Sequence, residues 1–213
     1  MSQCLGTVVL LPRIDWGSMH VEHVHSRADR QFGLLTRDDL RRSGASDKQI
    51  EHLVRTKAIL RVHRKVYRLP GAPRSVEQDA LGACMALGDY AVTSHITGGR
   101  LWKFFDREGL PEVSVPRGRR CEQSTLVVHR PTTLTRDEVT RIGIIPVTRV
   151  ARTLSDLQPR LPSDDLEEAL DEALRRRMVT PAQLAKYPRL RKLAQDRMEH
   201  GVPGSKLIAF FVD

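Results

Sequence analysis

The sequence predicts a two-domain α+β protein: an N-terminal winged helix-turn-helix, followed by a mixed α/β domain with a small sheet and a helical C-terminal end. Three observations support this prediction. Two capping boxes and a pair of short β-branched segments lie between residues 21 and 70. A linker containing Gly71 and Pro73 follows at residues 71–75. Strand and helix patterns then alternate, and the last third of the chain is helical.

The first domain is expected at residues 21–70, after a disordered extension at residues 1–20. An initial helix is followed by a very short strand at Leu34-Leu35. Thr36–Asp39 and Ser46–Gln49 then have the pattern of capping boxes, in which the first residue caps a helix and the fourth reaches back to it. They predict two helices joined by a tight turn, as a helix-turn-helix requires.

From Ile59 the pattern changes from helix to strand. Ile59–His63 and Val66–Leu69 are short segments with β-branched and aromatic residues, and a basic turn at residues 63–65 joins them. Three helices followed by a β-hairpin is the element order of a winged helix-turn-helix.

The second domain, residues 76–213, contains both periodicities. Ser163 is expected to cap its clearest helix, in which leucine and alanine form one apolar stripe. The expected helices cover residues 77–87, 91–97, 148–157, 164–178 and two segments between 180 and 201, and the expected strands cover 112–116, 125–129 and 142–147.

Positive charge is concentrated in the first domain. The chain has 35 Lys and Arg against 26 Asp and Glu, which gives a net charge of +9. Residues 26–70 hold 12 of the basic and 5 of the acidic residues, so +7 of that charge lies in about a fifth of the chain. Such a surface favours a polyanionic partner, either nucleic acid or an anionic membrane.

The cysteines and the hydropathy pattern indicate the cellular compartment in which the protein is expected. Cys4, Cys84 and Cys121 are widely spaced and form no C-x-x-C pair, which disfavours a disulfide framework or a zinc site and fits a reducing cytoplasm. The apolar run Val8–Leu11 is too short for a signal peptide or a spanning helix. We therefore expect a cytoplasmic protein without a membrane partner.

The segment from Asp47 to Lys57 has the pattern of a DNA-recognition helix. At about 100° per residue its apolar residues share one side, whereas Lys48, His52 and Arg55 line the opposite side. Taken alone, this basic side could equally be a solvated helix face. The basic hairpin that follows favours double-stranded DNA, with the helix in the major groove and the hairpin at the phosphates.

Base contacts are expected from Gln49, His52 and Arg55, and contacts that position the protein from Lys48 and the hairpin. A turn further along the chain forms a second-tier basic site that could equally be a solvated hairpin loop. The predicted DNA-binding residues are Ser46, Lys48, Gln49, His52, Arg55, Lys57, Arg61, His63, Arg64, Lys65 and Arg68, and those of the second-tier site are Arg117, Arg119 and Arg120.

No catalytic, cofactor or metal site is predicted. His20, His23 and His25 lie close in sequence but lack distant ligands that would fix their geometry. Ser94 and His95 are neighbours on an expected helix, where their side chains diverge by about 100°, so capping or packing is the expected role. We expect no enzymatic activity.

Several motifs resemble one known family. Gly33–Thr36 (GLLT), the helix pair after it and Arg61–Leu69 (RVHRKVYRL) are similar to the N-terminal winged helix of the AbiEi antitoxins. Ala91–His95 (AVTSH) with Leu101-Trp102, and Ile144–Leu157 (IIPVTRVARTLSDL), are similar to the domain that follows it in actinobacterial members. The resemblance covers roughly residues 26–201, and its second block is the more specific part.

The resemblance implies an antitoxin of a type IV toxin–antitoxin system of abortive infection. Its first domain would bind inverted repeats in the promoter of its own operon and repress it. Its second domain would counteract a nucleotidyltransferase toxin without forming a stable complex. Some relatives carry a further nuclease domain, and we expect none here.

Two alternatives remain open. A winged-helix regulator without a toxin partner would use its second domain to sense a ligand or to dimerise, and the absence of a downstream nucleotidyltransferase gene would favour it. The other alternative is an enzyme, either a nuclease or an antitoxin that acts enzymatically on the toxin or its substrate. Turnover that depends on a divalent metal would favour it, but the sequence offers no acidic cluster to support it.

Overall fold

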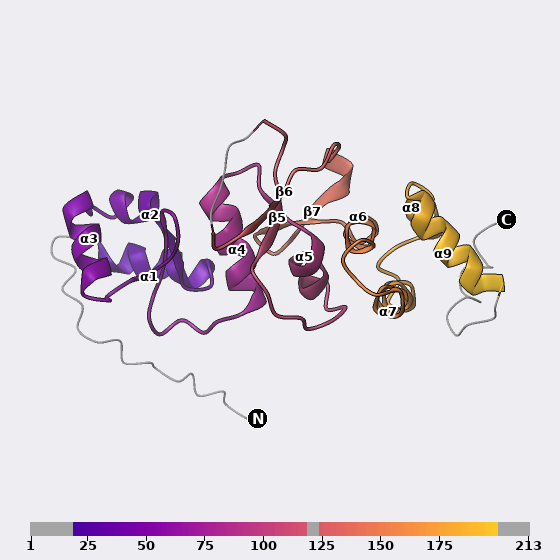
Figure 1. Cartoon of the computed structure of the whole chain (residues 1–213). Helices are drawn as coiled ribbons and strands as arrows, with labels where there is room; N and C mark the ends of the chain where they lie inside the picture. Colours follow the sequence, from indigo (N-terminus) through magenta and orange to yellow (C-terminus); the bar gives the residue numbers. More distant parts are fainter. Residues whose placement is uncertain (1–18, 119–123, 200–213) are drawn as a thin grey trace, which may run out of the picture. The chain divides into compact units, whose positions relative to one another are not determined.

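The computed structural model describes residues 19–118 and 124–199, and the chain divides into two compact units between Gln78 and Asp79. Helices and two small sheets make up these units (Figure 1), which confirms the predicted α+β class. The division falls within helix α4 (Val76–Leu87), a few residues after the linker expected at 71–75.

Three helices open the N-terminal unit: α1 (Val21–Arg30), α2 (Arg37–Arg42) and α3 (Asp47–Arg55). Both predicted capping boxes are confirmed. The Thr36 side chain accepts from the Asp39 N–H, and the Ser46 side chain accepts from the Gln49 N–H, with the reciprocal bonds also present. These boxes satisfy backbone donors that a helix start otherwise leaves unpaired.

A three-stranded antiparallel sheet completes the N-terminal unit. Its strands are β1 (Leu34–Thr36), β2 (Leu60–His63) and β3 (Val66–Arg68), in the order β1-β3-β2. The predicted short strand therefore pairs with the second strand of the hairpin. The helices and the sheet share one apolar core, which includes Val24, Ala28, Leu35, Leu40, Ile50, Leu53, Ile59 and Tyr67.

The expected disordered extension needs a correction at its end. Residues 1–18 lie outside the described residues. Met19, however, is 6% exposed and belongs to the core of the N-terminal unit, and the His20 N–H donates to the Ser43 carbonyl at 3.0 Å. Burial of the Met19 side chain therefore holds this part of the chain against the folded unit.

Gly33 joins α1 to β1 in a conformation that favours glycine. Its φ is +79°, and a Cβ placed there would lie 2.1 Å from the Cβ of Ala72. We expect Gly33→Ala to lower the free energy of unfolding by about 2–3 kcal/mol, because left-handed backbone costs an L-residue and the clash forces a shift. Urea denaturation would measure the change.

The matched control is Gly109→Ala, since a Cβ at Gly109 would meet nothing within 4 Å. If both substitutions changed stability equally, the close approach of Gly33 to Ala72 would not matter.

The C-terminal unit contains a five-stranded mixed sheet. In spatial order its strands are β6 (Val127–His129), β5 (Glu112–Ser114), β4 (Val92–Thr93), β8 (Ile145–Thr148) and β7 (Val139–Ile142). Strand β4 pairs antiparallel with β5 and parallel with β8, and β5 pairs parallel with β6.

Two expectations for this unit were wrong. The helix expected at residues 91–97 is instead strand β4 followed by helix α5 (His95–Leu101). The single strand expected at residues 142–147 is a hairpin of β7 and β8, and Gly143 turns between them with a φ of +57°. A glycine inside a strand pattern was the signal for that turn.

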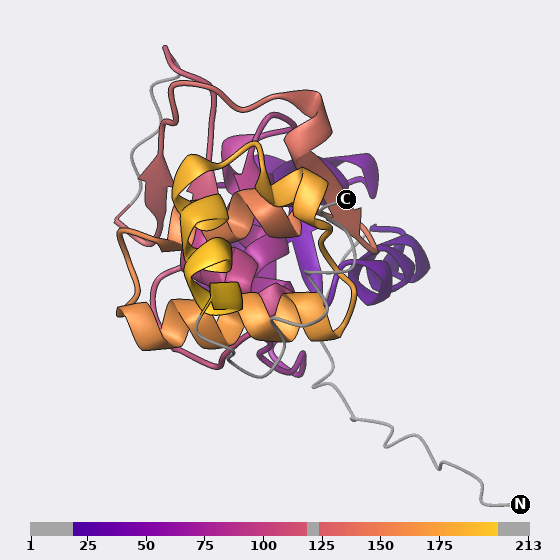
Figure 2. The same ribbon diagram turned by 90° about the vertical axis from the view of Figure 1, so that its right-hand side faces the viewer.

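Helices cover both faces of the five-stranded sheet. Helix α4 packs on one face against Val113, and α5 and α6 (Val150–Leu157) cover the other (Figure 1). The outer layer is formed by α7 (Ser163–Arg175), α8 (Pro181–Leu184) and α9 (Pro188–Glu199), which pack on α6 (Figure 2). Ser163 was expected to be the N-cap of this helix. Pro162 holds the N-cap position instead, and Ser163 is the first residue of α7.

The length and hydropathy of the helices bear on whether one of them could span a membrane. Among the helices of residues 19–118 and 124–199, each is too short or too polar to cross a bilayer.

Candidate nucleic-acid interface

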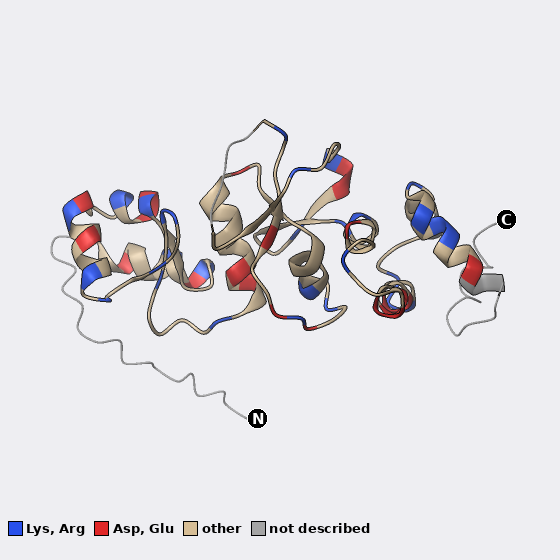
Figure 3. Ribbon diagram, in the orientation of Figure 1, with Lys and Arg blue, Asp and Glu red and all other residues tan. Residues whose placement is uncertain are grey.

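Helix α3 directs its apolar side to the core and its basic side to solvent. Ile50 and Leu53 are buried, whereas Lys48, His52 and Arg55 are exposed. Figure 3 marks the basic and acidic residues along this helix. The amphipathic arrangement predicted from the sequence is confirmed.

Arg55 and His52 form one hydrogen-bonded group on the exposed side of α3. A guanidinium N–H of Arg55 lies 3.0 Å from Nδ1 of His52. Because a guanidinium can only donate, Nδ1 must be unprotonated, and the imidazole proton then lies on Nε2. The pair thus presents several donors, which suit the two acceptors on a guanine edge in the major groove.

The acid at the start of α3 is paired with two arginines of the preceding segment. Asp47 accepts from Arg41 at 2.8 Å and from Arg37 at 2.9 Å, and these hydrogen bonds hold the pKa of Asp47 below its ordinary value. Glu51 is the other acid within α3. No role was predicted for Arg37 and Arg41 from the sequence, although Arg41 and Arg42 lie next to each other shortly before the cap of α3.

The turn of the β2–β3 hairpin carries exposed basic side chains. Arg64 and Lys65 form this turn, and Lys65 has a left-handed φ of +63°. Arg61 is also exposed, and its guanidinium carbon lies 5.9 Å from the centroid of the Tyr67 ring. That distance is typical of a cation–π contact, which restrains the arginine over the strand.

His63 does not lie at the hairpin tip as expected. The register of β2 against β3 shifts between Arg61 and His63, so the alternation of inward and outward side chains is broken there. His63 consequently points inward and is 9% exposed, and desolvation lowers its pKa. A buried imidazole is not placed to contact a phosphate.

The other predicted residues differ in their exposure and in the hydrogen bonds that they make. Ser46 and Lys57 are exposed at the two ends of α3. The side-chain oxygen of Gln49 accepts from both the Ser46 N–H and the Ser46 hydroxyl at 2.8 Å, so it is used in the capping box. Arg68 is partly buried and donates to the Ala72 carbonyl at 2.7 Å. The side-chain oxygen of Gln49 and the guanidinium of Arg68 are therefore already engaged in structural hydrogen bonds.

The second-tier basic site lies in the C-terminal unit. Arg117 is exposed and donates to the Thr132 hydroxyl at 2.9 Å, whereas Arg119 and Arg120 lie outside the described residues. Because β5 and β6 are parallel, the segment between them is not a hairpin loop. The interpretation of this turn as a solvated hairpin loop was therefore wrong.

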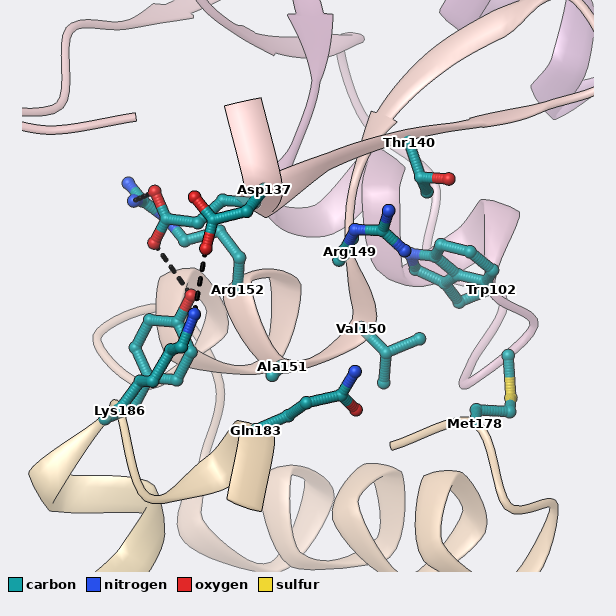
Figure 4. A pocket seen from close by; sticks show the side chains of 12 residues that line it. Trp102, Asp137, Thr140, Arg149, Val150, Ala151, Arg152, Met178, Gln183 and Lys186 are labelled. Carbon is teal, nitrogen blue, oxygen red and sulfur yellow. Dashed lines mark hydrogen bonds and ion pairs between the residues drawn. The ribbon is translucent and has the colours of Figure 1, made fainter. Parts of the chain in front are cut away.

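The C-terminal unit also contains a cavity of about 600 Å³, within the usual range for small-molecule sites. Figure 4 shows Arg149 and Trp102 on one side, with Asp137 and Lys186 on the other. Lys186 Nζ lies 2.8 Å from Asp137 Oδ2, and this pairing raises the pKa of Lys186. The lining is therefore mixed in charge.

The floor of this cavity is held by a buried ion-pair network. Arg152 lies 2.9 Å from Asp156 and 3.1 Å from Glu138, and the Tyr187 hydroxyl donates to Glu138 at 2.8 Å. Arg152 and Asp156 lie four positions apart on α6, a spacing that brings their side chains together. Burial raises the pKa of Asp156 to about 6, against the opposing effect of Arg152.

A second polar cluster lies on the sheet face that α5 covers. His129 Nε2 donates to Glu112 Oε2 at 2.6 Å, and Arg160 donates to Glu112 Oε1 at 3.1 Å. Burial alone would raise the pKa of Glu112, but the bond from His129 and the nearby cations hold it below its ordinary value. Desolvation lowers the pKa of His95 to about 3, and His129 adds to this effect.

Ser94 and His95 belong to this cluster, and their side chains do not diverge as expected. Ser94 is extended and His95 has a φ of +50°, so neither has the helical geometry that would separate them. The Ser94 hydroxyl lies 2.9 Å from His95 Nδ1 and makes no capping bond to α5.

An exposed cationic helix followed by a basic hairpin is an arrangement typical of DNA-binding transcriptional regulators. Residues 26–70 match the family model described as "Transcriptional regulator, AbiEi antitoxin", so the resemblance to AbiEi antitoxins is confirmed over this segment. The match supports a DNA-binding antitoxin, and the family is regulatory, not enzymatic. It covers about a fifth of the chain and lies within the N-terminal unit.

Among solved structures, the chain is similar to the RV2827C protein from Mycobacterium tuberculosis. The TM-score is 0.54 at 16% sequence identity, and the alignment covers 92% of this chain and 77% of that one. At this identity the likeness shows a shared fold. No curated protein matches the chain.

Proposed function

We propose that the N-terminal unit is a winged helix-turn-helix that binds the promoter of its own operon and represses transcription. Helix α3 would enter the major groove, and the β2–β3 hairpin would contact the flanking phosphates as the wing. The observation that carries this proposal is the exposed row of Lys48, His52 and Arg55, opposite a buried apolar side, inside the segment that matches AbiEi regulators.

In this proposal one set of residues reads the bases and another set positions the protein on the DNA. His52 and Arg55 would contact base edges, whereas Lys48, Lys57, Arg61, Arg64 and Lys65 would mainly contact phosphates. Inverted repeats in the operator would place two copies of the unit about one helical turn apart. The protein would act in the cytoplasm, where its DNA is accessible.

We further propose that the C-terminal unit counteracts a nucleotidyltransferase toxin encoded beside it, in the manner of a type IV antitoxin and without a stable complex. Support for this half comes from the resemblance of residues 91–95 and 144–157 to the second domain of actinobacterial AbiEi proteins.

The test is a titration of the purified chain against its own upstream duplex and a scrambled duplex, at about 50 and 200 mM salt. With roughly 5 phosphates neutralised, affinity for the upstream duplex should fall by roughly 500-fold between the two salt concentrations. The upstream duplex should bind more tightly than the scrambled one at both. Equal, weak binding to both duplexes would contradict specific repression.

A second candidate function is a winged-helix regulator whose C-terminal unit senses a small molecule. The cavity of about 600 Å³ lined by Trp102, Arg149 and Lys186 favours it. An operon without a nucleotidyltransferase gene would favour this candidate over the antitoxin.

A further inference from the structure

Three side chains that are distant in sequence converge in the C-terminal unit. His95 is the first residue of α5, Glu112 the first of β5 and His129 the last of β6. One ligand atom from each lies within 4.8 Å of the other two. Two imidazoles and a carboxylate are a ligand set that proteins use for Zn²⁺ and related divalent ions.

The sheet itself produces this convergence. Side chains alternate along a strand, so Glu112 and Ser114 face α5 while Val113 faces α4. Strand β6 runs parallel to β5 with His129 beside Ser114, which brings the imidazole to the same face as the Glu112 carboxylate. The three residues are thus fixed by regular structure and not by a loop.

His95 is held in a conformation that few non-glycine residues adopt. Its φ of +50° brings its ring onto that of His129, with the two centroids 3.4 Å apart and the planes inclined by 11°. This backbone conformation costs free energy in a non-glycine residue, and it persists where the surrounding structure requires it. Here the consequence is that the two imidazole rings stack face to face.

Hydrogen bonds from outside the group orient two of the three side chains, those of His95 and Glu112. The Ser94 hydroxyl lies 2.9 Å from His95 Nδ1, and the same hydroxyl lies 2.8 Å from that of Ser114. Arg160 binds one oxygen of Glu112 and leaves the other facing His129. Outer partners of this kind, on the second ring nitrogen and the second carboxylate oxygen, are typical of metal ligands.

We propose that His95, Glu112 and His129 bind a divalent transition-metal ion, with Zn²⁺ the ion that fits best. Metal–ligand bonds of about 2.1 Å in tetrahedral geometry place two ligand atoms about 3.4 Å apart. The 2.6 Å contact between His129 Nε2 and Glu112 Oε2 would open by about 0.8 Å, and the ion would replace the proton between them.

No metal site was predicted from the sequence. Three protein ligands is the number found in zinc sites that keep a coordination position for water or another group. The proposal concerns the C-terminal unit alone and does not depend on the DNA-binding function.

The test is equilibrium dialysis of the full chain against Zn²⁺, with bound metal measured by mass spectrometry. The unmodified chain should bind one Zn²⁺ saturably, and Co²⁺ in its place should give the visible absorption of a low-coordinate site. His129→Ala should abolish this binding, and Ser94→Ala should weaken it about 10- to 100-fold by freeing the His95 ring. Circular dichroism would establish that each variant is folded.

The matched control removes histidines elsewhere. His20, His23 and His25 lie in or beside α1, and the rings of His20 and His23 are 5.5 Å apart. The triple variant His20→Ala, His23→Ala and His25→Ala should keep the bound Zn²⁺. Loss of binding in this control, or unchanged binding in His129→Ala, would overturn the proposal.

A second measurement needs no variant. Anomalous scattering at the zinc edge, from a crystal of the unmodified chain grown with Zn²⁺, should give a peak between His95, Glu112 and His129. A peak elsewhere, or none, would also overturn the proposal.

Discussion

Arg55→Ala is expected to weaken binding to the operator by roughly 1–3 kcal/mol, which is about 5- to 150-fold, and to relax specificity at one base pair. The reason is geometric. Arg55 is exposed on α3, and its hydrogen bond holds His52 in the tautomer that presents an N–H outward. Loss of Arg55 therefore removes the guanidinium donors and no longer fixes the His52 donor at the base edge. Competition titrations with operators altered at single positions would measure both effects.

Arg64→Ala should behave differently, because Arg64 lies in the hairpin turn and would contact phosphate. It should weaken cognate and scrambled duplexes by a similar factor and reduce the slope of log affinity against log salt by about 1. Neither substitution touches the C-terminal unit, so neutralisation of a co-expressed toxin should persist in both variants.

The matched control for both is Arg30→Ala. Arg30 is an exposed arginine of α1 whose guanidinium bonds Ser26, and it was not predicted to contact DNA. If Arg30→Ala weakened binding as much as Arg55→Ala, the effect would reflect net charge and not base readout. If Arg55→Ala and Arg64→Ala left both affinities unchanged, the DNA face would be wrongly assigned.

The sequence predicted those parts of the first unit that depend on local chemistry. The capping boxes at Thr36 and Ser46 and the amphipathic side of α3 follow from residues within a few positions of one another. The inward turn of His63 could not be predicted in this way, because it depends on how β2 is registered against β3.

The second unit shows the same limit more strongly. Val92-Thr93 lies within a segment with a helical pattern, but it becomes a strand because β5 and β8 pair with it from both sides. Such non-local pairing overrides local propensity. The metal ligands proposed above were missed for the same reason: His95, Glu112 and His129 share no local motif and meet through the parallel pairing of β5 with β6.

Asp39 is a buried acid of the N-terminal unit. Its side chain is 5% exposed, and it accepts from the Thr36 hydroxyl at 2.7 Å, the Thr36 N–H at 2.9 Å and Arg27 Nε at 3.1 Å. The Gln31 side chain donates to it at 3.3 Å. One carboxylate thus connects α1, the Gln31 side chain that follows it, and Thr36, which ends β1 and caps α2.

Asp39→Ala is expected to lower the free energy of unfolding by about 3–5 kcal/mol, because it leaves several buried donors without an acceptor. Urea denaturation would measure this loss. Asp38→Ala is the matched control, since Asp38 lies beside it in the first turn of α2 but is exposed, and its loss should cost about 0.5 kcal/mol or less. Equal losses in the two variants would contradict the role given to Asp39.

The pH dependence of this loss separates the charge of Asp39 from its packing. Burial alone would raise the pKa of Asp39, but hydrogen bonds from Thr36 and Gln31 and the charge of Arg27 outweigh it and hold the pKa below its ordinary value of 3.8. A carboxyl with a depressed pKa in the folded state stabilises fully above its unfolded pKa and loses that contribution as the pH falls through the folded value. The stability difference between the unmodified chain and Asp39→Asn should therefore be constant near neutral pH and shrink below about pH 4. A difference that stayed constant into acid would show that the shape of the side chain, and not its charge, holds α1 to α2.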